Sequence, residues 1–190
     1  MSAAPGLRTG SVRAAEFTLR PLDPFTDCEL VLSWVTHPKS VFWMMQDARL
    51  QDIEREYMAV AAHPHQDAFI GSARGRPGYL MERYDPRHVC LAGLYDARPG
   101  DIGMHLLAAP TDTPVPGFTR AALASALREL FADPAVERVV VEPDIRNTRA
   151  HALFAHAGFE ILGLIEKPEK DAYLGACTRE SFERSASGAL

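Results

Sequence analysis

The sequence has few cysteines and none of the spacings that hold a metal ion or a disulfide framework. Cys28, Cys90 and Cys177 are odd in number and far apart, and no Cys-x-x-Cys or Cys/His ligand spacing occurs. We therefore expect no disulfide framework and no zinc site, and a reducing cytoplasm as the location. Cys90 and Cys177 lie in apolar, strand-like runs, which predicts small buried thiols. His63 and His65 have no third ligand nearby in the chain, so they indicate an exposed linker and no metal.

Long apolar runs and an excess of positive charge are also missing. No apolar stretch approaches the ~20 residues that a membrane span needs, and the N-terminus has no apolar core typical of a secretory signal. The chain carries 25 acidic and 20 basic residues, a formal charge of -5. A nucleic-acid binder needs a basic face for the phosphates, so we expect neither a nucleic acid nor a membrane as partner.

The 190 residues suffice for one domain with a substantial core. We expect a single α/β domain over 16–183, between flexible tails at 1–15 and 184–190 that are rich in serine, alanine and glycine. Period-two and period-3.6 patterns predict a strand, two helices and a hairpin over 17–84. A strand, helix, strand, helix series follows over 101–159, and then two last strands.

One histidine lies in the middle of the strand predicted at 102–109. The run is apolar nearly throughout, which is typical of a central strand buried on both faces. A lone histidine there is as often a core residue as a catalytic one. The neighbouring valine-rich strand favours catalysis, because Glu142, Pro143 and Asp144 stand at its carboxyl end. One crossover helix joins the two strands, so they should be parallel, and ligands bind at the carboxyl ends of such strands.

The hairpin strand places Glu82 on one face with Leu80 and Tyr84. The glutamate is either an edge-strand carboxylate paired with an arginine or a carboxylate in the cleft that attracts an ammonium group. Phe42 and Trp43 belong to an apolar segment without a clear period. They serve either the core or the wall of a substrate pocket.

The helix predicted at about 117–132 begins with features of an anion site. Its first turn offers free N–H groups and the positive end of the helix dipole, and Arg120 adds a cation. Pro116 cannot donate an N–H, so the backbone is a weak phosphate cradle by itself. Asn147 is expected to cap the next helix.

Three segments together carry a family resemblance. They are Gly103-Met104-His105-Leu106-Leu107, Pro116-Gly117-Phe118-Thr119-Arg120, and Glu142-Pro143-Asp144-Ile145-Arg146-Asn147. The chain resembles the siderophore-biosynthesis branch of the GNAT superfamily of acyl-CoA-dependent N-acyltransferases, of the aerobactin, mycobactin, and alcaligin or desferrioxamine types. The resemblance implies a mixed, mostly antiparallel sheet with a central parallel strand pair, flanked by helices. It also implies transfer of an acetyl or succinyl-type group from acyl-CoA to the amine or hydroxylamine of lysine, N-hydroxycadaverine or N-hydroxyputrescine, making a hydroxamate by direct attack in a ternary complex.

The resemblance implies roles for particular residues. His105 and Asp144 match the catalytic positions of the family, and which of the two takes the proton stays open. His105, titrating near neutrality, is the better proton acceptor, and Asp144 would orient it or the substrate hydroxyl. The backbone N–H of Leu106 or Leu107 would bind the oxyanion. The residues expected to bind the acyl-CoA are Leu106, Leu107, Pro116, Gly117, Phe118, Thr119, Arg120 and Asn147. The residues expected to bind the amine are Phe42, Trp43, Glu82 and Tyr84. The glycine-rich Arg/Gln-x-x-Gly-x-Gly/Ala loop of many GNAT proteins is replaced here, which gives Arg120 more of the pyrophosphate to hold.

Several alternatives stay open at this point. The substrate could instead be a protein N-terminus, a polyamine or an aminoglycoside, and a non-catalytic acyl-CoA binding domain is the alternative outside enzymes. The acyl group, the amine and the choice between monomer and homodimer are not determined. The resemblance implies action alongside an N-hydroxylase and a siderophore synthetase.

Overall fold

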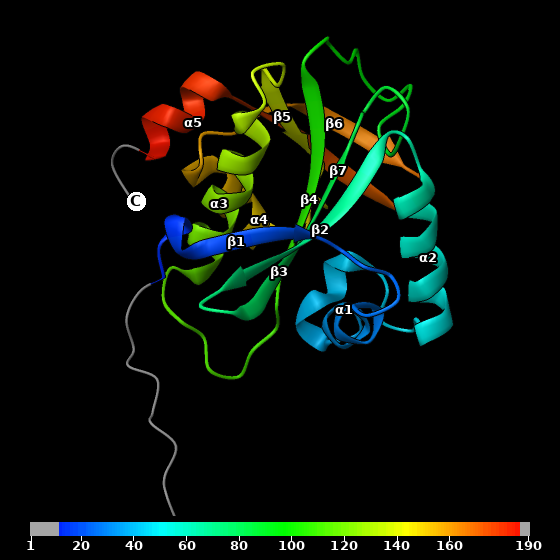
Figure 1. The fold of residues 1–190 in the computed structure, drawn as a ribbon. Coiled ribbons are helices and arrows are strands. Elements are labelled where there is room, and N and C mark those ends of the chain that lie inside the picture. Colours follow the sequence, from blue (N-terminus) through cyan, green and yellow to red (C-terminus); the bar gives the residue numbers. More distant parts are fainter. Residues whose placement is uncertain (1–11, 187–190) are drawn as a thin grey trace, which may run out of the picture.

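The computed structural model describes residues 12–186, which form one mixed seven-stranded sheet with helices on both faces (Figure 1). The strand order is β1-β2-β3-β4-β5-β7-β6. Only β4 and β5 pair in parallel, and every other pair is antiparallel, so the predicted fold class is confirmed. The elements are η1 Ala14–Glu16, β1 Phe17–Pro21, α1 Cys28–Val35, η2 Pro38–Trp43, α2 Leu50–Ala62, β2 Gln66–Ala73, β3 Arg76–Tyr84, β4 Asp101–Ala108, α3 Phe118–Ala132, β5 Arg138–Val141, α4 Thr148–His156, β6 Glu160–Lys167, β7 Lys170–Thr178 and α5 Arg179–Ala186.

Helix α3 shows how local sequence sets these bounds. Its Ala- and Leu-rich run has high helix propensity, and its N-cap, Gly117, has φ 78°, a left-handed value that suits glycine. Asp133 ends the helix with extended backbone just before Pro134, which cannot continue it. The next strand, β5, is a run of valines whose branched side chains fit a buried sheet.

The sheet has a separate apolar core on each face. One core joins α3 to the sheet through residues such as Leu123 and Leu127. The opposite core packs α1 and α2 over the first strands, with Val31 and Ile53 fully buried. A third cluster lies on the other half of this second face, where Leu91 of the long segment between β3 and β4 covers β5, β6 and β7.

Most of the predicted elements are present, and two expectations need correction. Helix α5 was not expected, and it extends into the segment predicted as a tail from residue 184. Phe182 is a buried apolar residue in a run of charged and small residues, so periodicity hardly signals this helix. Cys90 is exposed in a bend with φ 56°, whereas a buried strand thiol was expected. Residues 1–11 and 187–190 of the expected tails lie outside the described residues.

The remaining cysteine predictions can be compared directly. Cys28 and Cys177 are buried, and all three cysteines are free thiols. Within residues 12–186, no helix is both long and apolar enough to cross a membrane.

Candidate active site

The parallel strands β4 and β5 separate soon after they begin to pair. Only Asp101, Ile102 and Gly103 of β4 have partners on β5, although β4 continues to Ala108. A buried ion pair between Arg138 and Asp101, 2.7 Å from Nη2 to Oδ2, closes the paired end. From Met104 onward, β3 is the only described strand that pairs with β4. The other edge of β4 therefore faces a cavity.

The alternation of hydrogen bonds along β4 shows which N–H groups face this opening. Ala109 donates its N–H to the carbonyl of Gly78, in register with the β3–β4 ladder. In an antiparallel pair every second residue makes such bonds, so Leu107 and His105 also direct their N–H groups to β3. The N–H of Leu106 therefore faces the open edge. Of the two oxyanion donors considered from sequence, only Leu106 has this orientation.

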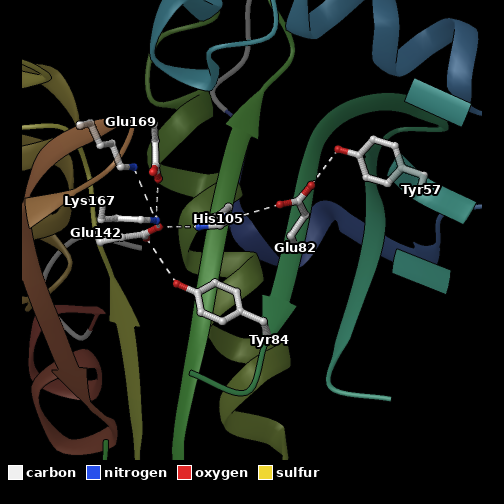
Figure 2. A network of polar contacts seen from close by, with 8 residues as sticks. Tyr57, Glu82, Tyr84, His105, Glu142, Lys167 and Glu169 are labelled. Atoms are coloured by element: carbon white, nitrogen blue, oxygen red, sulfur yellow. Dashed lines mark hydrogen bonds and ion pairs between the residues drawn. The ribbon is translucent and has the colours of Figure 1, made fainter. Parts of the chain in front are cut away.

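His105 lies between two glutamates from neighbouring strands (Figure 2). Its Nδ1 lies 3.0 Å from Oε2 of Glu82 on β3, and its Nε2 lies 2.9 Å from Oε1 of Glu142 at the end of β5. The sheet register places Glu82 directly opposite His105. We call these three side chains the Glu–His–Glu cluster.

Further polar residues hold the two glutamates in place (Figure 2). The hydroxyl of Tyr57 on α2 donates to Glu82 over 2.7 Å, and the hydroxyl of Tyr84 donates to Glu142 over 3.4 Å. Lys167 donates to Glu142 over 3.0 Å and pairs with Glu169 at the same distance. The side chain of Glu142 is only 2% exposed, and its carboxylate accepts hydrogen bonds from these residues, as a buried carboxylate must.

The cluster changes the proton affinity of its members. Burial alone would lower the pKa of His105, but the charge and hydrogen bond of Glu142, together with Glu82, outweigh it and raise the pKa from 6.5 to about 10. Burial would likewise raise the pKa of Glu142, but His105, Lys170 and Lys167 lower it well below its usual value. The expectation that His105 titrates near neutrality is therefore wrong, because its two partners are carboxylates and the imidazolium is the stable form at neutral pH.

The cavity has a volume of about 1290 Å³, which exceeds the ~300–1,000 Å³ typical of a single small-ligand pocket. It has room for two substrates side by side. Trp43 lines it and contacts the His105 ring edge to face, with the two ring centroids 6.2 Å apart. Tyr84 and Pro116 do not line it: Tyr84 is buried beneath His105, and Pro116 is exposed outside. The predicted site residues that do line it are Phe42, Trp43, Glu82, His105, Leu106, Leu107, Gly117, Phe118, Thr119, Arg120, Asp144 and Asn147.

Asp144 has a different partner from the one expected. Its carboxylate accepts the backbone N–H of Arg146 over 2.8 Å and forms a bidentate pair with the same guanidinium. That pair lowers the pKa of Asp144 to about 2. Both ring nitrogens of His105 are occupied by glutamates, so the expectation that Asp144 orients this histidine is not met. Glu142, two residues earlier, is the acid of this segment that reaches it.

Sequence reasoning missed five residues of this network as site residues: Tyr57, Glu142, Lys167, Glu169 and Lys170. Glu142 carried a signal, since an acid that directly follows a buried valine strand is unusual. The two lysines had none, because they flank an ordinary hairpin turn between β6 and β7. They reach Glu142 only because β7 lies next to β5 in the sheet.

Two helix N-termini meet at the other end of the cavity. Gly117, Phe118, Thr119 and Arg120 begin α3, and Asn147 caps α4 by accepting the N–H of Ala150 over 3.2 Å. Arg120 and Arg149, each in the first turn of its helix, are exposed and line the cavity. Neither forms an ion pair within residues 12–186. Free N–H groups, helix dipoles and unpaired cations make this end attractive to phosphate groups.

A sheet whose one parallel strand pair separates over a cavity, with helix N-termini at one end, defines an acyltransferase of the GNAT type. The chain belongs to the GNAT acetyltransferase domain family, whose model matches residues 23–167. As a member of this family it is an enzyme, an N-acetyltransferase.

Three relatives are named for different amine substrates. The lysine N-acyltransferase MbtK of Mycobacterium sp. (strain MCS) is 29% identical over 94% of this chain and 74% of its own length. The N-hydroxyputrescine acetyltransferase of Acinetobacter baumannii is 28% identical over 87% of this chain and 79% of its own. An aminoglycoside N(6')-acetyltransferase type 1 of Klebsiella pneumoniae is also 28% identical, over 85% of this chain and 83% of its own.

Solved structures agree on the fold. A protein of unknown function from Bacillus halodurans superimposes with a TM-score of 0.84 at 25% identity, covering 90% of this chain and 88% of its own. The aminoglycoside acetyltransferase AAC(6')-Ib, solved with paromomycin and acetyl-CoA, gives 0.80 at 25% identity, covering 92% and 99%.

Proposed function

We propose that this enzyme transfers an acetyl or succinyl-type group from acyl-CoA to the hydroxylamine of N-hydroxylysine or of an N-hydroxydiamine, making a hydroxamate for siderophore biosynthesis. The observation that carries the chemistry is the separation of β4 from β5. It sets the N–H of Leu106 and the Glu–His–Glu cluster on one cavity. The sequence motifs and the names of two relatives support this substrate class.

Acyl-CoA binding is supported by the phosphate-attracting end of the cavity. The first turn of α3 and the guanidinium of Arg120 would hold the pyrophosphate, and Arg149 stands close enough to the same cavity to add a second cation. The pantetheine arm would lie along the open edge of β4, where backbone groups lack a partner strand. The related AAC(6')-Ib structure was solved with acetyl-CoA, which supports the same co-substrate here.

The cluster supplies the proton chemistry of the transfer. The nitrogen of the substrate attacks the thioester carbon, and the N–H of Leu106 stabilises the oxyanion that develops. The nitrogen then loses a proton as the carbon–sulfur bond breaks. His105 already holds its proton at neutral pH, so we infer that the carboxylate of Glu82, which lines the cavity, accepts the new one. His105 and Tyr57 keep that carboxylate oriented.

The acylation of an aminoglycoside is the second candidate. Relatives and solved structures of that class match as well as the lysine and N-hydroxyputrescine acyltransferases do. The polar groups around the cluster weigh against it. Glu142 is already neutralised by His105 and Lys167, so it does not offer a free negative charge to a polycation. The reacting nitrogen of a hydroxylamine is itself largely neutral near pH 7, so the cluster need not offset a charge on it.

A thiol-release assay distinguishes the candidates. Purified protein is incubated with acetyl-CoA or succinyl-CoA and one acceptor: N-hydroxyputrescine, N-hydroxycadaverine, N6-hydroxylysine or kanamycin. We expect rapid release of free CoA with a hydroxylamine and slow release with kanamycin. Mass spectrometry of the product should show the N-acylated hydroxamate.

Two outcomes contradict parts of the proposal. Turnover with kanamycin but not with any hydroxylamine would contradict the proposed hydroxylamine substrate. It would still agree with the proposed acyl transfer. Saturable CoA binding without release on any acceptor, including polyamines and N-terminal peptides, contradicts the proposed acyl transfer.

A further inference from the structure

A second cluster of ligating side chains lies at the end of the β2–β3 hairpin, outside the described cavity. It consists of His65, directly before β2, of Asp85, directly after β3, and of His88, three residues further along the chain. One potential ligand atom from each residue lies within 4.8 Å of the others. In the sequence, His65 has only His63 beside it. The fold brings the two further ligands to it because β2 and β3 are antiparallel neighbours.

We propose that His65, Asp85 and His88 bind a divalent transition-metal ion such as Zn²⁺. Two imidazoles and a carboxylate are a donor set that suits zinc, with a water molecule as the fourth ligand. Ca²⁺ and Mg²⁺ prefer sites in which every donor atom is oxygen, so we do not expect this site to prefer either ion.

The backbone already holds two of the ligands in place. Asp85 donates its N–H to the carbonyl of His65 over 2.8 Å, which ties the two residues together across the hairpin. The imidazole rings of His65 and His88 stack with centroids 3.9 Å apart and planes 12° from parallel. Nearly parallel rings do not direct both lone pairs at one point, so binding requires a rotation of one ring. The side chain of His88 is 50% exposed, and it is the one that we expect to turn.

Arg87 competes with the ion for the carboxylate of Asp85. Its guanidinium forms a bidentate pair with Asp85, with distances of 2.9 Å and 2.6 Å. A carboxylate has about four lone-pair sites, so it can bind a metal ion while it keeps one of these bonds. Loss of the arginine should therefore strengthen metal binding or leave it unchanged.

The site would hold in place a segment that reaches the catalytic cavity. The segment that follows His88 contains Cys90, which lines the cavity, and Leu91, which is fully buried in the third core cluster. A bound ion would fasten this segment to the start of β2. Because the ion binds only the folded arrangement, it should raise Tm as its concentration increases.

Titration calorimetry of untagged, metal-free protein with ZnCl₂ tests the site, without acyl-CoA, so the result does not depend on the proposed reaction. We expect one saturable site per chain, and at least ~10-fold weaker binding in His65→Gln and in His88→Gln. The matched control, His37→Gln, changes a histidine that is not part of the cluster. Arg87→Ala should bind Zn²⁺ at least as tightly as the wild type.

The proposal is overturned if the wild type shows no saturable heat, or if His37→Gln weakens binding as much as the cluster variants do. Circular dichroism checks that each variant is folded. If a histidine variant does not fold, the test relies on Arg87→Ala. Loss of Zn²⁺ binding in this variant would contradict a metal ion held by Asp85. A Tm that does not rise with Zn²⁺ contradicts the proposal as well.

Discussion

His105 shows how two neighbours can reverse the role that a side chain has by itself. A histidine in solution is neutral at slightly alkaline pH and serves as a base. Between Glu82 and Glu142 it is an imidazolium whose pKa is about 10. The two carboxylates, and not the histidine alone, therefore set its charge at neutral pH.

Replacing Glu82 by glutamine should lower kcat by ~100-fold or more, because a positioned general base contributes about that much. The amide keeps the size of the side chain; its oxygen can accept from His105, and its NH₂ group can donate to the Tyr57 hydroxyl oxygen. Steady-state kinetics with saturating acyl-CoA measures the change. Asp67→Asn, on β2 and paired with Arg83 at the surface, is the matched control and should leave kcat unchanged. Near-wild-type kcat in Glu82→Gln would show that another group takes the proton.

His105→Ala should also lower kcat by ~100-fold or more, since it removes the partner that orients Glu82. Asp144→Ala should behave differently, because this carboxylate holds the N–H and guanidinium of Arg146 rather than the histidine. Arg146 lines the cavity just before the start of α4, so we expect KM for acyl-CoA to rise ~10-fold, the cost of losing a charged hydrogen bond, with kcat nearly unchanged. A ~100-fold loss of kcat in Asp144→Ala would restore its assignment as a catalytic residue.

At the scale of elements, the start of α3 decides how the acyl-CoA is held. Its cap is glycine, and the cradle before it contains proline, so Arg120 should carry much of the phosphate binding. Arg120→Ala should raise KM for acetyl-CoA by about 10-fold or more. Arg128 lies on the same helix, exposed and away from the cavity, and Arg128→Ala is the control. Equal KM values in the two variants would place the pyrophosphate elsewhere.

Gly103 marks the last residue at which β4 and β5 pair. A Cβ at this position would lie 2.1 Å from the Tyr84 ring, a buried side chain that cannot move away easily. Gly103→Ala should therefore lower the free energy of unfolding by ~1–3 kcal/mol or more, as expected for overpacking. Gly163→Ala, on the edge strand β6 with nothing within 4 Å of its Cβ, should be close to neutral. Urea unfolding of both variants tests the difference.

For the whole molecule, the Glu–His–Glu cluster links stability to pH. The pKa of His105 is raised on folding, so its contribution is fully present below pH 6.5 and is lost as pH rises through about 10. The pKa of Glu142 is lowered, so its contribution is present above pH 4.5 and is lost in acid. Stability should therefore decline on both sides of neutrality.

Urea unfolding between about pH 7 and pH 9 tests this linkage. The free energy of unfolding of the wild type should fall with pH more steeply than that of His105→Gln, which cannot titrate. Equal slopes would mean that His105 is not charged in the folded protein.

The sequence by itself determined the order of elements and the position of the cleft. Hydrophobic periodicity located the strands and most helices, and the crossover rule predicted the parallel pair β4–β5. The same patterns placed His105, Leu106 and the start of α3 in one region. Periodicity and the crossover rule depend only on residues that are close together along the chain, so the sequence suffices for them.

Only the tertiary structure decided what these residues touch. Glu82 reaches His105 through the register of β3 on β4, and Lys167 reaches Glu142 because β7 lies beside β5. Asp144 is paired with Arg146, and His65 meets His88 across a hairpin. Electrostatic energies change over a few ångströms, whereas periodicity identifies only the face of an element. The charge state of the candidate site therefore follows from contacts between strands.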